Sequence, residues 1–174
     1  MQKRGEFEPP VPVEIDPVSG RWEVGGLPMV LVPQHLLVNN LDAVEARVGR
    51  DEAGQLYRDA GRRSARHWCE HESARLGLSG TATVEHYLDQ LTRRGWGRFA
   101  IDVLDPVRGK LCVRVEHSAL LPVAGSVRSV DRACYLFEAW LEGALQHASG
   151  RPQPVTVREI RCGIAADECL FRSD

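Results

Sequence analysis

The 174-residue sequence lacks any long apolar run. A helix that crosses a membrane needs about 18 consecutive apolar residues, and the most apolar segment, residues 24–33, is interrupted by two glycines and two prolines. The first ten residues, MQKRGEFEPP, carry positive charge with no apolar run behind them, so we predict no signal peptide. We therefore expect a cytoplasmic protein that makes no contact with a membrane.

The sequence also lacks a large excess of either charge. Its 22 Lys and Arg against 24 Asp and Glu give a net charge of -2 and a pI of about 6.3. Nucleic-acid binding relies on a cationic excess, so we expect no nucleic-acid partner. Hydrophobic residues make up 43%, which is ordinary for a globular protein. The five cysteines cannot all pair within one chain, and in a reducing compartment they are expected to be thiols or metal ligands.

Fingerprints of common catalytic and cofactor sites are missing as well. There is no G-x-G-x-x-G, no P-loop and no G-x-S-x-G. The glycines of Arg94-Gly95-Trp96-Gly97 follow a predicted helix and precede a predicted strand, which is the wrong order for a phosphate-binding turn. We assign no catalytic residue, and we favour a protein that is not an enzyme.

What is present predicts an α+β fold with antiparallel strands. Alternating residues around Asp16-Pro17-Val18-Ser19-Gly20 predict an N-terminal β-hairpin, and Asp105-Pro106 with Gly109 predicts the turn of a second. Helices are expected at 41–49, 51–75, 84–94 and 132–148, the last capped by Asp131, and strands at 98–104, 110–116, 154–162 and 168–172. We divide the chain into an extension with the hairpin, 1–26, and one domain, 27–174.

The strongest chemical pattern is E-x-x-C-x6-C near the C-terminus, formed by Glu159, Cys162 and Cys169. A turn between two strands would bring the two sulfurs together, and Cys134 could add a fourth ligand from the start of the last helix. Three thiolates and one carboxylate suit tetrahedral zinc better than calcium or magnesium. The alternative is that these cysteines are small buried hydrophobic residues.

Other polar residues give weaker signals. His67 and His71 share one helix face and could bind a metal, with Cys69 between them, but we favour a polar helix face with Trp68 in the core. His86 and His117 each follow a glutamate and could anchor a ligand or serve structure alone. Tyr135 and Trp140 lie on the last helix and could line a ligand cavity, because such cavities are mainly apolar and aromatic, or simply fill the core.

Three segments together make the sequence similar to the 4-vinyl reductase (4VR) domain family: IDVLDPVRGKLCVRVEHSALL, then ACY followed by EGAL, and VREIRCGIAADECLF. The resemblance covers residues 37–171. It implies a fold like the small subunits of the TRAPP transport complex, with about four helices packed on one side of an antiparallel sheet, and a homodimer. In aromatic-responsive bacterial regulators this domain is the sensor and holds zinc. The matching ligands here are Cys134, Glu159, Cys162 and Cys169, although the last two cysteines lie one residue closer than in those sensors.

The segments VNN, HWCEHE, EHYLDQLTRRGWG and EHSALL resemble a standalone bacterial branch of this family, which we associate with breakdown of methylated glycines. The sensor tryptophan that contacts phenol would fall near Val115, so phenol itself is not implied. Nothing in the sequence indicates the hydride-transfer site that the family name suggests.

Three hypotheses follow. The first is a non-enzymatic domain with a structural zinc that binds an apolar or aromatic small molecule and forms a homodimer through the N-terminal hairpin or adjacent helices. Its ligand-binding residues would be His86, Val115, His117, Tyr135 and Trp140, and a partner protein that reads out binding is left open. The second is an enzyme or enzyme accessory with His86, His117 or Cys69 in acid-base roles. The third is a protein-interaction module whose pocket is filled by side chains.

Overall fold

The computed structural model describes residues 11–121, 134–152, 155–163 and 168–174. The chain divides between Val32 and Pro33 into two compact units, and each unit is described by itself. Among the described residues, no helix combines the length and the apolar character that a membrane crossing requires.

The N-terminal unit contains a three-stranded antiparallel sheet of β1 (Glu14–Ile15), β2 (Trp22–Val24) and β3 (Leu27–Met29), in that order. Asp16 builds the predicted hairpin turn by accepting hydrogen bonds from the Val18 N–H, at 2.8 Å, and the Ser19 hydroxyl. The third strand was not predicted, because its proline indicates an extended segment rather than a strand. Gly25 and Gly26 both have positive φ, 57° and 78°, as a two-residue hairpin turn requires.

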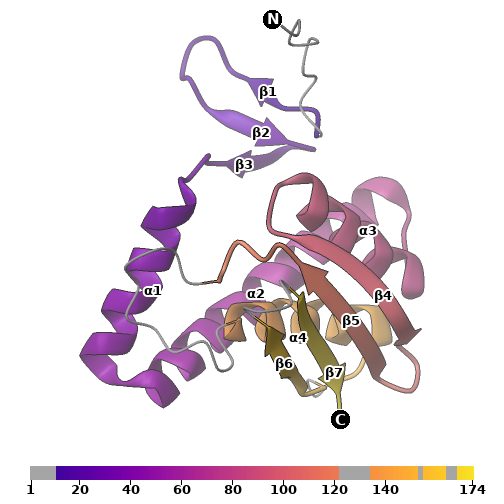
Figure 1. The fold of residues 1–174 in the computed structure, drawn as a ribbon. Helices are drawn as coiled ribbons and strands as arrows, with labels where there is room; N and C mark the ends of the chain where they lie inside the picture. Colours follow the sequence, from indigo (N-terminus) through magenta and orange to yellow (C-terminus); the bar gives the residue numbers. More distant parts are fainter. Residues whose placement is uncertain (1–10, 122–133, 153–154, 164–167) are drawn as a thin grey trace, which may run out of the picture. The chain divides into compact units, whose positions relative to one another are not determined.

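Within its described residues, the second unit carries four helices and a four-stranded antiparallel sheet, which confirms the α+β fold (Figure 1). The sheet order is β4-β5-β7-β6, so the C-terminal hairpin pairs with the central strand β5 through β7. In chain order the elements are α1 (Gln34–Val48), α2 (Arg50–Leu76), α3 (Thr81–Arg93), β4 (Arg98–Asp105), β5 (Lys110–Glu116), α4 (Tyr135–Ser149), β6 (Val157–Gly163) and β7 (Glu168–Ser173).

Three helix starts differ from the prediction by three residues or more; one of them is α3, which begins at Thr81 rather than at residue 84. The first helix begins at Gln34 rather than at residue 41, directly after Pro33, which takes the N-cap position with an extended backbone (φ -61°, ψ 138°). The last helix begins at Tyr135 with Cys134 as its N-cap. The predicted cap Asp131 lies outside the described residues. The shift of the last helix start places the Cys134 backbone at a helix N-terminus, where it affects the candidate site.

The two faces of the four-stranded sheet have opposite character. Leu111, Val113 and Val115 of β5 point to one side and are buried against the helices. The other side carries ion pairs between neighbouring strands, including a bidentate contact of Arg114 with Asp102. Further pairs on that side are Arg98 with Glu116 and Arg161 with Glu168. The sheet therefore has one face covered by helices and one polar face.

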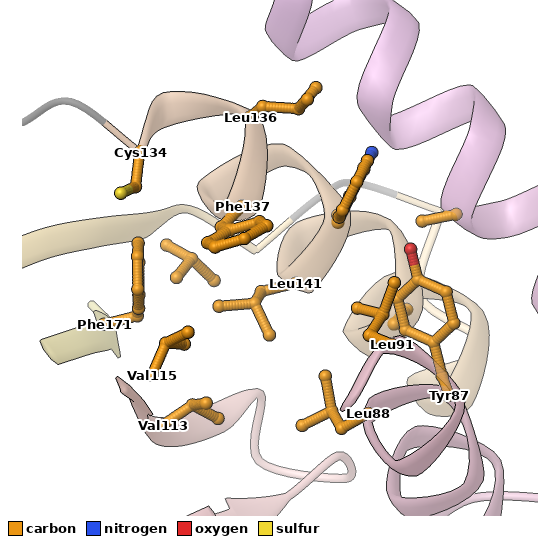
Figure 2. Packing of buried hydrophobic residues seen from close by; sticks show 14 of the residues in the cluster. Tyr87, Leu88, Leu91, Val113, Val115, Cys134, Leu136, Phe137, Leu141 and Phe171 are labelled. Carbon is orange, nitrogen blue, oxygen red and sulfur yellow. The ribbon is translucent and has the colours of Figure 1, made fainter. Parts of the chain in front are cut away.

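Helix α4 forms the centre of the core, and every residue from Tyr135 to Leu145 is buried. Its Phe137 ring lies edge-on to Phe99 of β4, with ring centroids 5.2 Å apart. On β7, Phe171 also faces Phe137 (Figure 2), and the two ring centroids are 6.2 Å apart. One turn later in α4, the Trp140 ring lies edge-on to the Trp96 ring, with the ring centroids 4.7 Å apart. These contacts anchor both hairpins of the sheet to one helix.

Helices α2 and α4 cross closely because small residues face each other. A Cβ added to Gly143 would lie 2.6 Å from the carbonyl oxygen of Arg62 and 2.9 Å from the Ala65 Cβ. A Cβ added to Gly61 would lie 2.8 Å from the Ala139 Cβ. Backbone atoms cannot yield as a flexible side chain can, so the helices would have to separate.

We therefore expect Gly143→Ala to lower the free energy of unfolding by about 1–3 kcal/mol, as overpacking of a core does. Gly54→Ala on α2 is the matched control, because no atom lies within 4 Å of its added Cβ. In that helical position alanine should stabilise by roughly 0.5–1 kcal/mol. Urea denaturation of both variants measures the difference, and equal stabilities would contradict the close approach of the helices.

Candidate metal centre

Four side chains from three elements meet at one end of the sheet. Cys134 lies at the start of α4, Glu159 and Cys162 lie on β6, and Cys169 lies on β7. Cys162 and Cys169 are directly paired in the β6–β7 ladder, so the strand register itself brings their sulfurs together. The four candidate ligand atoms all lie within 4.8 Å of one another. The structure thus assembles the whole set that the sequence proposed.

The spacing of the sulfurs fits a tetrahedral ion. Cys134 Sγ lies 3.7 Å from Cys169 Sγ, and Cys162 Sγ lies 3.6 Å from the same atom. In a tetrahedral site with Zn–S bonds of about 2.3 Å, two sulfurs lie about 3.8 Å apart. A common centre at bonding distance from these thiols is therefore available. This holds for Cys169 too, despite its shorter spacing from Cys162 along the sequence.

The surroundings of Glu159 leave one of its carboxylate oxygens in place to bind a cation. The Cys134 N–H donates to its Oε2 at 3.1 Å, which holds the carboxylate at the N-terminus of α4. Its Oε1 is buried and has no hydrogen-bond partner among the described residues. A buried carboxylate oxygen without a partner is costly, and a metal ion would satisfy it.

The raised pKa values in the cluster also show that its deprotonated groups would be stabilised by a bound cation. Burial, followed by the nearby Cys162 thiol, raises the pKa of Glu159 to about 8. Hydrogen bonding with Cys162 and Cys169, together with burial, raises the pKa of Cys134 well above its usual value. Without a cation these groups favour their protonated forms, whereas metal binding needs thiolates and carboxylate. Occupation of the site would therefore release protons.

Two further side chains hold the ligands in place. The Ser118 hydroxyl lies 3.5 Å from Cys134 Sγ and accepts the Leu120 N–H at 3.1 Å. Glu138, fully buried on α4, accepts the backbone N–H of Glu159 at 2.7 Å. Such outer contacts orient metal ligands and tune their affinity.

A buried ion-pair network holds the first residues of β6 against α4. Arg58 of α2 contacts Glu138 and Glu142 of α4, the latter at 2.6 Å. Glu142 also accepts the Val157 N–H at 3.0 Å. Burial raises the pKa of Glu142. Sequence analysis missed all three residues, since a Glu pair at i, i+4 with a distant Arg is typical of an exposed helix face. The apolar and small residues around the pair in α4 were the signal available.

Three of the predicted ligand-binding residues, Val115, Tyr135 and Trp140, belong to one buried hydrophobic cluster, in which each has different neighbours. Val115 lies in the core opposite Cys169, and a Cβ on Gly97 would lie 2.8 Å from its side chain. Trp140 packs against Trp96 and Phe137. Tyr135 lies next to Tyr57, with ring centroids 5.9 Å apart, and lines a polar pocket.

The two predicted histidine anchors lie elsewhere again. His117 is exposed just after β5, with a φ of 53°. His86 of α3 contacts the buried Glu72 at 2.9 Å and stacks on Trp68. Arg75, with further hydrogen bonds from His86 and His71, holds the pKa of Glu72 at about 2. His86 therefore pairs with a carboxylate that links α2 to α3.

The second candidate metal cluster has a different environment. His67 is exposed, and His71 lies 3.3 Å from Glu72. Cys69 is fully buried, and desolvation raises the pKa of its thiol to about 12. In the described part of the chain, no group of three or more candidate ligands forms around these residues.

Comparison with solved structures defines the class of fold. The chain is similar to the phenol-responsive sensory domain of the transcription activator PoxR, solved with phenol, with a TM-score of 0.71. The match covers 92% of this chain and 83% of the other at 17% sequence identity, so it shows a shared fold. The chain belongs to the family described as domain of unknown function DUF5943, whose model matches residues 7–102. A search of curated proteins finds no match.

Proposed function

We propose that this protein is a non-enzymatic small-molecule-binding domain of the sensory type, held together by a structural zinc. The observation that carries the proposal is the cluster of Cys134, Glu159, Cys162 and Cys169, spaced for a tetrahedral ion on a fold shared with a phenol-responsive sensory domain. This pairing of fold and ligand set also supports the resemblance to the 4VR family.

The donor set favours zinc over harder cations. Thiolates are soft ligands, and three of them with one carboxylate satisfy the four positions of a tetrahedral ion. Four protein ligands leave no open position for substrate, which is the arrangement of structural zinc sites. The ion would join α4 to the β6–β7 hairpin.

The groups outside the cluster support a binding role over a catalytic one. The raised pKa of Cys69 keeps its thiol protonated, so this cysteine is a poor nucleophile. His86 is engaged by Glu72, and His117 lies at the surface. An apolar or aromatic ligand, a homodimer and a partner for readout stay part of the proposal, and Val115, Tyr135 and Trp140 remain its candidate ligand contacts.

Elemental analysis tests the zinc proposal directly. We expect about one zinc per chain in purified, untagged protein, and much less in Cys162→Ser. Cys112→Ser is the matched control, because Cys112 is a buried cysteine of β5 outside the cluster. Equal zinc content in all three proteins, or none in any, would contradict the site.

A thermal-shift panel of phenol, toluene and indole tests the ligand class in the same preparations. A bound ligand at 100 times its dissociation constant stabilises by about 2.7 kcal/mol, which is a clear shift. No shift with any member of the panel would count against an aromatic ligand.

A further inference from the structure

A second site lies in the same unit, at the start of α2. It is a pocket of about 350 Å³. Three arginines from two elements line it: Arg50 and Arg58 from the first turns of α2, and Arg158 from β6. Asp51, Gln55 and Tyr135 complete most of the wall. Its volume falls within the range of small-molecule sites, roughly 300–1,000 Å³.

The arginines of this pocket differ in how far other side chains neutralise them. Arg58 turns towards Glu138 and Glu142, which neutralise it. The Nη2 atom of Arg50 is buried and has no hydrogen-bond partner among the described residues. A guanidinium cannot lose its proton, so a buried N–H of this kind is costly until an acceptor reaches it. Arg158 is exposed, and Asp51 is the opposing charge in the wall.

The backbone adds to the same preference. Helix α2 starts after Gly49, which has no side chain to cap the first N–H groups. These groups and the helix dipole favour an anion at the N-terminus. Asp51 and Glu52 offset part of this effect from within the first turn. The arginines therefore decide the sign of the site.

We propose that this pocket binds a small anion through a carboxylate or phosphate group held by Arg50 and Arg158. The planar guanidinium fork matches both groups with paired hydrogen bonds. The unpartnered Nη2 of Arg50 supplies one donor, and Arg158 closes the site from β6. Tyr135 is shared with the candidate contacts of the aromatic ligand, but Arg50 and Arg158 belong neither to that set nor to the metal cluster. The anion proposal therefore does not depend on the zinc or on the aromatic ligand.

Calorimetric titration of the full chain tests the proposal with two probes, sodium phosphate and sodium succinate, at constant ionic strength set by sodium chloride. We expect saturable binding of at least one probe. Phosphate alone would assign a phosphoryl ligand, and succinate alone a carboxylate. Binding of neither probe would overturn the proposal, whatever the zinc content of the protein.

Three variants locate the binding. Arg50→Gln and Arg158→Gln should each weaken it at least tenfold, and Asp51→Asn should tighten it by removing the opposing charge. Arg108→Gln is the matched control, an exposed arginine of the β4–β5 turn outside the pocket, and should leave affinity unchanged. Because Arg158 is exposed, its variant keeps the fold, which circular dichroism checks. Equal affinities across Arg50→Gln, Arg158→Gln and the parent would overturn the assignment to this pocket.

Discussion

Removing the proposed zinc is expected to produce a large loss of stability in this protein. A chelator such as EDTA should lower the melting temperature of the wild-type protein, and Cys162→Ser should lower it without chelator. At a free metal concentration 1,000 times the dissociation constant, binding contributes about 4 kcal/mol to folding. Differential scanning calorimetry with and without chelator measures the loss, and adding zinc back should restore the wild-type value.

The effect should be local as well as global. The ion would tie the first turn of α4 to the paired residues Cys162 and Cys169, so chelation should first expose the amides of β6 and β7 to hydrogen exchange. Cys112→Ser should respond to chelator like the wild type. If chelator leaves the melting temperatures of the wild type and of Cys112→Ser unchanged, the cluster is a set of packed thiols without a metal.

Part of this site could be predicted because its geometry is local. The spacing of Cys162 and Cys169 across a turn is enough to predict that two antiparallel strands bring them together, as the register shows. Cys134 lies far away along the chain: its place at the start of a predicted helix made it only a possible fourth ligand, and the family resemblance then supported it. Nothing in its surroundings predicts the contact of its N–H with Glu159.

The predicted ligand-binding residues show what sequence patterns cannot predict, namely which side chains become neighbours in the fold. Alternation places Val115 on the inner face of a strand but does not reveal that Gly97 approaches it closely. Helical spacing places Tyr135 and Trp140 on one helix, yet α4 is buried on all sides, so the two rings have different neighbours. A histidine after a strand can end either inward or outward, and His117 is exposed. These outcomes depend on long-range packing.

The ion-pair network is a further case of long-range packing, and it gives the second large prediction. Arg58→Met should lower the free energy of unfolding at neutral pH by about 3–5 kcal/mol, because it removes the guanidinium that contacts both buried carboxylates, Glu138 and Glu142. Arg62 would remain 3.7 Å from Glu142 Oε2, a longer contact than that of Arg58. Both glutamates are almost completely buried, and the Arg58 side chain is 12% exposed. Chemical denaturation measures the loss, and Arg63→Met, an exposed arginine of the same helix, should change stability little.

The pH dependence separates loss of charge from loss of packing. Burial already raises the pKa of Glu142 in the folded protein, and removing Arg58 should raise it further. An acid with a raised folded pKa binds a proton more tightly when folded, so its contribution to stability falls as pH rises through that range. The deficit of Arg58→Met should therefore be small near pH 4.5 and grow towards pH 7.5. Adding Glu138→Gln and Glu142→Gln should recover much of the loss at pH 7.5. A deficit that stays constant with pH would mean that Arg58 acts through packing alone, and that the carboxylate holding the Glu159 backbone does not need its charge.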